Sequence, residues 1–341
     1  MVGKKELLGD MLGRTGLATA WLRSMPAAGD RLLVLAYHRV LDLHDEAQFP
    51  QDPELISASV GDFRQQMRVV RDHFNPLTFR DVLASLDAGR ALPPRSVVVT
   101  FDDGHLDNHR NAFPVLKALG VPACIFLTTD YIGSEHMFWF DRIALLIHAA
   151  PRGEWQVGRQ SIWLDDESVA LRRHVAGRLL RHLKRVPDGE RLRCLDALEA
   201  ALGRYVPAGM APARSAVDWD EVREMAEAGI EFGSHTLSHP VLTQLDDSAL
   251  ERELGQSRQA ISAQLSCPVD TVAYPVGKAG AFDERVMAMS RRCGYRLGIS
   301  YETGVNHLGS LDRFAVRRLA VERYTSVPFF KSLLAFPALL A

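Results

Sequence analysis

The chain has 341 residues, and its hydrophobic content of 47% and charged content of 24% are those of a globular protein with one large domain or two ordinary ones. The formal net charge of −2 provides no overall basic field, so we expect no nucleic acid partner. The four cysteines are widely separated and follow no metal-ligand spacing, so nothing in the sequence requires an oxidising compartment.

Residues 1–29 are predicted to form an N-terminal amphipathic helix. Within residues 5–23 the apolar side chains recur at helical spacing, and these are Leu7, Leu8, Met11, Leu12, Ala18, Trp21 and Leu22. Lysines and arginines accompany them. Two interpretations follow: the helix packs on the domain, or it lies on an anionic membrane surface.

No targeting or membrane-spanning segment is predicted. Glu6, Asp10 and Arg14 interrupt the apolar residues of the N-terminus, whereas a secretory signal needs an uninterrupted apolar segment. A membrane-spanning helix needs a run of about 18 apolar residues, and no such run occurs. We therefore expect a cytoplasmic protein, and the apolar ends of the chain leave room for attachment to the inner face of the membrane.

Residues 30–325 alternate predicted strands with predicted helices, which implies mostly parallel strands covered by helices. The strands are short apolar runs at residues 32–37, 97–101, 121–128, 230–235, 271–274, 296–300 and 314–321. The helices lie at residues 59–74, 78–86, 106–119, 218–229, 248–265 and 282–292. Seven or eight such units predict a barrel or a partly closed barrel.

Two segments do not fit this alternation. Residues 138–212 are predicted to be a mostly helical insertion laid over the main domain, with a small hairpin at residues 154–164. Residues 326–341 form an apolar tail. Such a tail must be covered by the N-terminal helix, a second subunit or a membrane surface.

Polar residues follow two of the predicted strands. Asp102 and Asp103 come directly after one strand, and His235 and His239 follow another. Two histidines at positions i and i+4 are expected on one face of a helical turn, where both imidazoles reach one metal ion. Two histidine nitrogens and one carboxylate oxygen suit Zn²⁺ or a similar divalent ion in hydrolysis, and the second carboxylate stays free to take a proton from water.

These residues belong to two longer motifs. Thr100-Phe101-Asp102-Asp103-Gly104 resembles the first motif of the polysaccharide deacetylases, also called the NodB-homology domain or carbohydrate esterase family 4, and Ser234-His235-Thr236-Leu237-Ser238-His239-Pro240 resembles their second motif. The resemblance covers roughly residues 30–325. It implies an α/β fold, a distorted (β/α)7 barrel, and metal-dependent removal of N- or O-acetyl groups from sugars. It also implies that Asp102 is the general base and that the metal ligands are Asp103, His235 and His239.

The third family motif, an Arg-x-Pro-Tyr-Gly-like turn, departs from the family pattern here. It is Ala273-Tyr274-Pro275-Val276-Gly277, so Ala273 stands where the family places the arginine that orients the base. By resemblance, Tyr274, Pro275 and Val276 are expected to bind substrate. The Val276 backbone N–H is expected to contribute to an oxyanion hole, because no side chain is needed for that. Arg317 or Arg318, on a late strand, is the candidate replacement for the missing arginine.

The general acid of the family is a histidine that ends an apolar strand near the C-terminus, and no such strand occurs late in this chain. Instead, residues 32–38 form an apolar strand that ends in His38. The last strand of a closed barrel neighbours the first, so moving it to the N-terminus keeps its place in space. The arrangement is similar to a circularly permuted-looking subgroup, the poly-N-acetylglucosamine deacetylases, and implies that His38 protonates the departing amine. The alternative is a histidine that ends a strand and binds a loop carbonyl.

Other side chains have less specific expected roles. His105 and His109 are expected at the surface or behind the metal ligands. Phe138, Trp139 and Phe140 are expected in a helix core, or else as a wall on which sugar rings stack.

The sequence therefore predicts a hydrolase of carbon–nitrogen bonds other than peptide bonds, which removes acetyl groups from an N-acetylated poly- or oligosaccharide. Zinc is the preferred cofactor, and nickel, cobalt, manganese and iron suit the same ligands. The rivals are hydrolysis of another C–N amide on the same fold and a non-catalytic sugar-binding component of a polysaccharide export system. The apolar ends leave peripheral membrane contact or a homodimer as further partners.

Overall fold

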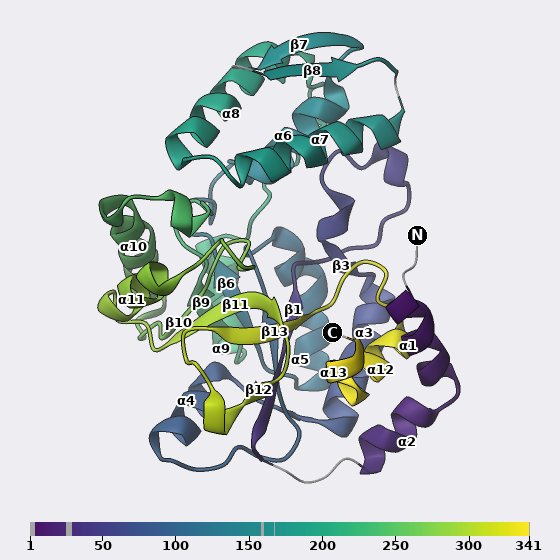
Figure 1. The fold of residues 1–341 in the computed structure, drawn as a ribbon, viewed down its shortest axis with the longest axis vertical. Helices are drawn as coiled ribbons and strands as arrows, with labels where there is room; N and C mark the ends of the chain where they lie inside the picture. Colours follow the sequence, from purple (N-terminus) through teal and green to yellow (C-terminus); the bar gives the residue numbers. More distant parts are fainter. Residues whose placement is uncertain (1–3, 25–28, 158–159, 167, 341) are drawn as a thin grey trace.

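A closed barrel of parallel strands forms the centre of the molecule. The computed structural model describes residues 4–24, 29–157, 160–166 and 168–340. Within these residues, the barrel strands in order around the ring are β1 (Arg31–Tyr37), β5 (Ser96–Phe101), β6 (Ala123–Leu127), β9 (Glu231–Ser234), β10 (Thr271–Ala273), β11 (Leu297–Thr303) and β13 (Val316–Ala320). The ring closes because β1 pairs in parallel with both β5 and β13 (Figure 1). The predicted (β/α)7 barrel is confirmed.

Helices cover the outside of the barrel, and several begin at capping residues. Ser59, Thr78 and Asp218 each accept a hydrogen bond from the backbone N–H of the third residue of the helix that follows. These outer helices are α3 (Val60–His73), α4 (Phe79–Asp87), α5 (Phe113–Leu119), α9 (Trp219–Glu227), α10 (Asp247–Leu265) and α11 (Glu284–Arg292). Two short strands, β4 (Asn75–Pro76) and β12 (Asn306–His307), add to the sheet beside β5 and β1.

One predicted helix differs from the structure. Residues 106–119 do not form one regular helix, because Asn108–Ala112 form a π-helical turn before α5 begins. Pro114 has no N–H and cannot donate the regular bond to the carbonyl four residues earlier, which favours such a turn.

The side chains of the barrel strands alternate between the barrel interior and the helical layer. On β5, Val98 belongs to the inner cluster, whereas Val97 and Val99 belong to the outer core. The same alternation continues to Asp102 just beyond the strand, which therefore lies on the inner side at the carboxyl end of the barrel. At the opposite end, Phe79, Val82 and Leu83 of α4 belong to the inner cluster and close the barrel.

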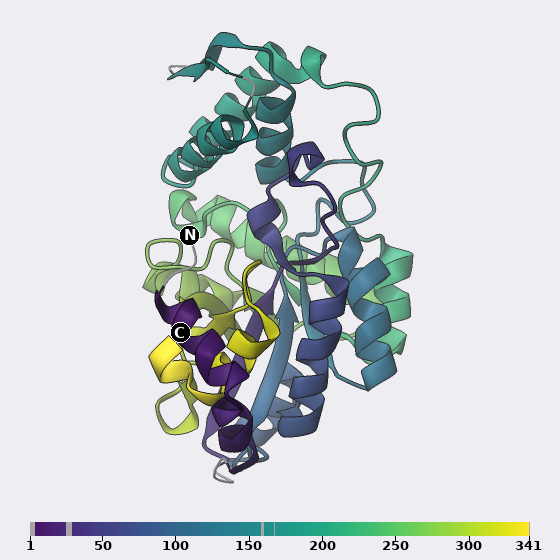
Figure 2. The same ribbon diagram turned by 90° about the vertical axis from the view of Figure 1, so that its right-hand side faces the viewer.

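Residues 138–212 lie beyond the carboxyl ends of the barrel strands, at the top of both views (Figures 1 and 2). Their elements are α6 (Trp139–Ala149), a hairpin of β7 (Gly153–Val157) and β8 (Gln160–Leu164), α7 (Val169–Leu183) and α8 (Asp188–Leu202). A second segment at this end carries the short parallel pair β2 (Arg39–Val40) and β3 (Ile56–Ala58). The insertion and this segment together border the carboxyl end of the barrel.

The N-terminal segment forms two helices, not the single helix expected for residues 5–23. The helices are α1 (Lys4–Arg14) and α2 (Leu17–Ser24), and they are separated at Gly16, whose φ is 77°. The C-terminal segment forms α12 (Val327–Ala335) and α13 (Pro337–Leu340), and α1 and α2 pack against α12 beside the barrel (Figures 1 and 2). None of the helices in the described part of the chain has both the length and the hydrophobicity that a membrane crossing requires.

Candidate active site

Asp102 and Asp103 lie at the carboxyl end of β5, where the chain turns away from the barrel. The Asp102 N–H donates to the Tyr37 carbonyl of the neighbouring strand at 3.0 Å, which continues the sheet up to this residue. Asp103 then adopts a left-handed conformation with φ of 73°, which is uncommon for a residue other than glycine. This change of direction separates two adjacent carboxylates, so that they face different partners.

Arg318 holds Asp102. Its Nη1 and Nη2 donate to the two carboxylate oxygens of Asp102 at 2.7 and 2.8 Å, a bidentate pair in which both residues are fully buried. Its Nε donates to the Ser300 carbonyl at 2.8 Å, which fixes the guanidinium plane. Arg318 thus occupies the role that the sequence left to Arg317 or Arg318, and Arg317 is exposed.

Strand alternation decides between the two arginines. Val316 belongs to the cluster inside the barrel, so Arg318, two residues later on β13, faces inward and Arg317 faces outward.

His235 and His239 converge from a loop and not from a helical turn, so that part of the prediction is wrong. Thr236 and His239 have φ values of 71° and 59°, which a right-handed helix cannot contain. Glu253 of α10 shapes the loop, because its carboxylate accepts from the N–H groups of Leu237 and Ser238 at 2.9 and 3.0 Å. The two imidazoles nevertheless meet, with ring centroids 4.8 Å apart.

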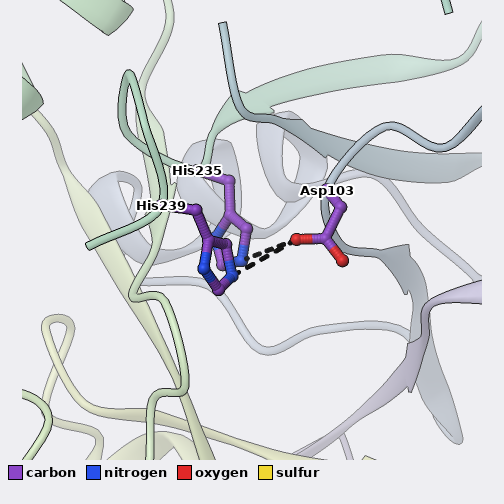
Figure 3. A group of neighbouring side chains, drawn as sticks. All are labelled: Asp103, His235 and His239. Atoms are coloured by element: carbon purple, nitrogen blue, oxygen red, sulfur yellow. Dashed lines mark ion pairs between the residues drawn. The ribbon is translucent and has the colours of Figure 1, made fainter. Parts of the chain in front are cut away.

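Asp103, His235 and His239 form a cluster with the composition of a metal site (Figure 3). Asp103 Oδ1 lies 3.6 Å from His235 Nε2 and 3.3 Å from His239 Nε2. The His235 Nδ1 contacts the Ala273 carbonyl at 2.8 Å, which leaves its Nε2 directed at Asp103. Within the described residues, Asp103 Oδ1 is buried without a hydrogen-bond donor. A carboxylate oxygen and two imidazole nitrogens that converge in this way fit a divalent cation such as zinc.

The pKa values of the cluster also suit the binding of a divalent cation. Burial lowers the pKa of His239 to about 3, so its imidazole is neutral and offers a lone pair. Burial would raise the pKa of the Asp103 carboxyl, but the neighbouring His105 and His239 hold it well below its usual range. A metal ion requires that a carboxyl ligand is ionised and that an imidazole ligand is neutral.

His38 and Tyr301 lie near Asp102 and line the same pocket. His38 Nε2 lies 3.8 Å from Asp102 Oδ2, and its ring centroid is 5.5 Å from that of Tyr301. Burial, opposed by the charges of Asp102 and Asp103, lowers the pKa of His38. The structure therefore places the histidine of the first barrel strand beside the paired aspartates, as the sequence led us to expect.

The turn after β10 brings one of its three expected substrate-binding residues to the pocket. Val276 lines the pocket with φ of 64°, and among the described residues its N–H has no acceptor. Tyr274 is turned away: its side chain is buried and its hydroxyl donates to the Phe314 carbonyl at 3.0 Å. Pro275 is buried, and its carbonyl accepts from the Gly277 N–H at 2.7 Å. The expectation of substrate contact through the Tyr274 side chain is therefore wrong, because strand β10 directs that residue into the outer core.

These groups border one cavity of about 280 Å³ at the carboxyl end of the barrel. Its walls come from the barrel, from residues 52–57 and from the insertion, and they include His38, Asp102, Asp103, His235, His239, Val276, Tyr301, Asp52, Glu54, Ser57, Phe140, Leu180, Lys184, Lys278 and Glu322. A pocket with converging polar groups and apolar and aromatic walls is the usual form of a small-molecule site.

The comparisons with known proteins identify the family. The sequence profile described as Polysaccharide deacetylase matches residues 89–298, which is more than half of the chain. The chain belongs to the polysaccharide deacetylase family. It is accordingly an enzyme that acts on carbon–nitrogen bonds other than peptide bonds, as the sequence predicted.

Individual relatives of this deacetylase are distant. YxkH of Bacillus subtilis (strain 168), named for the polysaccharide deacetylases, is 21% identical over 287 residues, 84% of this chain and 69% of that protein. The poly-beta-1,6-N-acetyl-D-glucosamine N-deacetylase of Staphylococcus aureus (strain MSSA476) is 30% identical over 119 residues, which span 33% of this chain and 41% of that protein. Among solved structures, the Streptococcus pyogenes deacetylase PplD in complex with acetate has a TM-score of 0.58 at 16% identity, over 87% of this chain and 95% of that one.

Tyr301 of the candidate site was not foreseen, and the structure decides between the two alternatives for each of His105 and His109. Tyr301 follows Leu297 and Ile299 on the inner face of β11, so strand alternation would have found it. His105 is fully buried with its Nε2 3.2 Å from Asp103 Oδ2, so it lies behind a predicted metal ligand and not at the surface. His109 contacts Glu224 at 2.9 Å and takes no part in the pocket.

The insertion contributes directly to the deacetylase site. The Trp139 indole N–H donates to the His239 carbonyl at 3.0 Å, and the Phe138 ring lies 4.6 Å from the His105 ring. Both aromatic residues are buried, so they form a helix core and not a sugar-stacking wall, whereas Phe140 borders the cavity. The first helix of the insertion thus supports the histidine loop from behind.

Proposed function

We propose that this enzyme removes the acetyl group from N-acetylated sugar units of a poly- or oligosaccharide, and that it uses a divalent metal ion, preferably zinc. The proposal rests on one observation: two adjacent carboxylates have different partners. Asp103 faces two imidazoles, whereas Asp102 faces Arg318 and the pocket. A hydrolase needs both, because the group that takes a proton must not be the group that holds the metal.

In the proposed mechanism, Asp103, His235 and His239 hold the metal ion. When bound, such an ion polarises a carbonyl and favours ionisation of water at neutral pH. The Asp102 carboxylate, held by Arg318, takes a proton from the attacking water. The Val276 N–H faces the oxygen of the acetyl carbonyl as negative charge develops there. His38, which lines the same pocket and lies 3.8 Å from Asp102, gives a proton to the departing nitrogen.

A partly deacetylated or fully acetylated oligomer of β-1,6-linked N-acetylglucosamine is the first substrate to test. The Staphylococcus aureus relative is named for that polymer. Its match covers 33% of this chain, so the linkage that this enzyme accepts is itself part of the proposal. β-1,4-linked chito-oligosaccharides should be tested beside it to determine which sugar linkage the enzyme accepts. O-acetylated sugars should be tested to determine whether it also hydrolyses O-acetyl groups.

The decisive experiment measures metal content and acetate release on the same variants. We expect Asp102→Asn to abolish acetate release and to keep bound zinc, because the amide has the size of the carboxylate and leaves the proposed metal ligands in place, but it cannot take up a proton. We expect His235→Ala to lose zinc and activity together. His109→Gln, a histidine outside the pocket, is the matched control and retains both. Acetate release by both Asp102→Asn and His235→Ala would refute the mechanism.

A separate variant tests His38. We expect His38→Ala to lower kcat by about 10²- to 10⁴-fold, the usual contribution of a general acid, with zinc content unchanged. Turnover near that of the wild type, with the metal still bound, would rule out the role of His38.

A further inference from the structure

The two N-terminal helices pack on the molecule with their small residues inward. On α1, Gly9 lies against Phe329 and Gly13 lies against the Pro328 backbone, so closely that an added Cβ would overlap either neighbour. On α2, Ala18 and Leu22 are buried. Apart from Leu22, most of the larger apolar side chains of the two helices are exposed, which differs from an ordinary surface helix.

The exposed large apolar side chains of the protein are concentrated on the neighbouring terminal helices. Of the nine that are exposed in the described residues, six lie on α1, α2 and α13, with exposed fractions from 38% to 62%, and they are Leu7, Leu8, Met11, Leu17, Trp21 and Leu339. We call this set the terminal face. Trp21 stacks near Phe336, with ring centroids 5.6 Å apart, so the N-terminal and C-terminal helices present the terminal face together. A concentration of exposed apolar side chains of this kind marks an interaction surface.

Basic side chains surround the terminal face. Arg31, Arg95 and Arg317 border a cavity of about 570 Å³ whose apolar walls include Trp21 and Phe336. In the described part of the chain, neither Arg95 nor Arg317 forms an ion pair with a carboxylate.

Acidic residues of the region pair with other arginines and not with Arg95 or Arg317 in the described residues. Asp10 accepts a hydrogen bond from Ser326 and pairs with Arg14 at 3.4 Å, and Asp30 lies 4.0 Å from Arg31. Partial burial lowers the pKa of His73. The negative charge of Asp72 opposes this shift, whereas the positive charges of Arg23, Arg95 and Lys331 add to it, so each of these cations acts on His73. The terminal face is therefore apolar with a positive border, on a chain whose net charge is −2.

We propose that the terminal face docks on an anionic lipid bilayer. Leu7, Met11, Leu17 and Trp21 insert among the acyl chains, and the surrounding arginines contact the lipid phosphates. A second copy of the chain is less well suited to cover this face, because a two-fold interface would bring the same positive border against itself.

Docking in this way leaves the pocket free. The terminal helices lie beside the barrel (Figures 1 and 2). The cavity with Asp102 is lined by residues at the carboxyl end of the barrel and by residues of the insertion. The enzyme would therefore contact the membrane through the side of the barrel that carries the terminal helices. The pocket would remain accessible to a polymer near the membrane surface. The inference is independent of the proposed chemistry.

The test is sedimentation of the full chain with lipid vesicles. We expect binding to vesicles of phosphatidylcholine with about one third phosphatidylglycerol, weak binding to phosphatidylcholine alone, and a loss of binding as salt is raised from about 0.05 M to about 0.5 M. We expect the double variant Met11→Gln, Leu17→Gln to lower binding by about ten-fold or more, because both side chains are more than half exposed. Its acetate release from a soluble oligosaccharide should equal that of the wild type.

Leu192→Gln is the matched control, because Leu192 is 49% exposed on the insertion, away from the terminal face, and its substitution should leave vesicle binding unchanged. Trp21 provides a second measurement. Brominated lipid should quench tryptophan fluorescence in the wild type and much less in Trp21→Phe. Equal binding to neutral and anionic vesicles would overturn the proposal. A salt-resistant dimer in solution that the Met11→Gln, Leu17→Gln variant abolishes would also overturn it, in favour of a second copy.

Discussion

Arg318 takes the place of the arginine that the third motif lacks, and it comes from a different strand. The family places an arginine where this chain has Ala273, yet Asp102 still has a bidentate guanidinium partner. The partner reaches Asp102 from β13, which is separated from β10 by β11 in the ring. The guanidinium partner of Asp102 therefore comes from a different strand than the third motif would predict.

Substitution of Arg318 should therefore impair both folding and catalysis. We expect Arg318→Gln to lower the free energy of unfolding by about 3–5 kcal/mol, because it leaves the buried Asp102 carboxylate without a counter-charge. In the protein that stays folded, kcat should fall by about 10- to 100-fold with zinc content unchanged, because Asp102 loses its orientation. Denaturant unfolding and steady-state kinetics check these two effects.

The neighbouring Arg317→Gln is the control, because Arg317 is exposed on the same strand. Arg318→Lys should lie between Arg318→Gln and the wild type, since lysine keeps the charge but not the bidentate geometry. If Arg318→Gln retained the wild-type kcat, Arg318 would not position the base.

The residues of the site were predictable to the extent that each lay in a motif or on a strand. The two motifs supplied the aspartates and histidines, and the alternation of β13 would have decided for Arg318, because Val316 faces inward. Glu253 and Trp139 were not predictable in their roles. Each acts through a contact to a backbone atom of the histidine loop, and no local pattern records such a contact. The loop itself was mistaken for a helical turn because the left-handed residues Thr236 and His239 carry no glycine signal.

At the scale of elements, α6 belongs to the catalytic structure although it begins the insertion. Trp139 donates to the carbonyl of His239 at 3.0 Å, and Phe140 lies 5.2 Å from the His239 ring. A helix outside the barrel thus restrains a loop that the barrel itself leaves free at one end. The insertion is therefore required for the shape of the site and does more than cover it.

Replacing Trp139 should weaken metal binding. We expect Trp139→Phe to reduce zinc affinity by about ten-fold, measured by competition with a chelator, because His239 loses the hydrogen bond that orients its loop. Trp155→Phe is the matched control, since the Trp155 indole donates to the Pro151 carbonyl at 3.1 Å within the insertion. Both variants lose one hydrogen bond, worth about 1 kcal/mol of stability. Equal zinc affinity in both would show that α6 does not support the site.

At the other end of the barrel, Glu231 joins β9 to α4. Its Oε2 accepts from the Phe79 N–H at 2.6 Å, and burial raises its pKa to about 7. An unfolded glutamate titrates near about pH 4.3. The stability that this protonated carboxyl contributes is therefore complete below about pH 4.3 and is lost as the pH rises toward about 7.

Glu231→Gln should remove this dependence. We expect the stability of the variant relative to the wild type to increase by about 2–3 kcal/mol between about pH 4 and pH 7, measured by urea unfolding at each pH. The exposed Glu227→Gln should show no such trend. A constant difference between variant and wild type across this range would contradict the assignment.

At the scale of the whole molecule, the ring of strands makes the site depend on distant parts of the chain. The predicted metal ligands follow β5 and β9, whereas His38 follows β1 and Arg318 lies on β13, and β1 pairs with both β5 and β13. Separation of β1, β5, β9 or β13 from the ring would displace at least one of these residues. Metal binding and folding should therefore be coupled across the whole barrel.

Metal addition should accordingly stabilise the entire barrel. At a free zinc concentration of 100 times the dissociation constant, the free energy of unfolding should rise by about 2.7 kcal/mol relative to the chelated protein. Differential scanning calorimetry should show one transition that moves up by several degrees. Asp103→Asn should show no such shift, because it removes the charged ligand. A shift confined to part of the transition would indicate that the barrel does not unfold as one unit.

The closure of the ring by β1 and β13 also has a consequence for the synthesis of the chain, because β13 is made late. A ribosome makes Asp103, His235 and His239 well before it makes β13, so the growing chain contains every predicted metal ligand while Arg318 is still absent. Chains released early, before β13, would lack the strand that closes the ring and the guanidinium that anchors Asp102. We therefore expect a chain that ends before β13 to contain all three predicted metal ligands and yet neither to hold zinc firmly nor to release acetate, because the ring that brings the ligands together is still open.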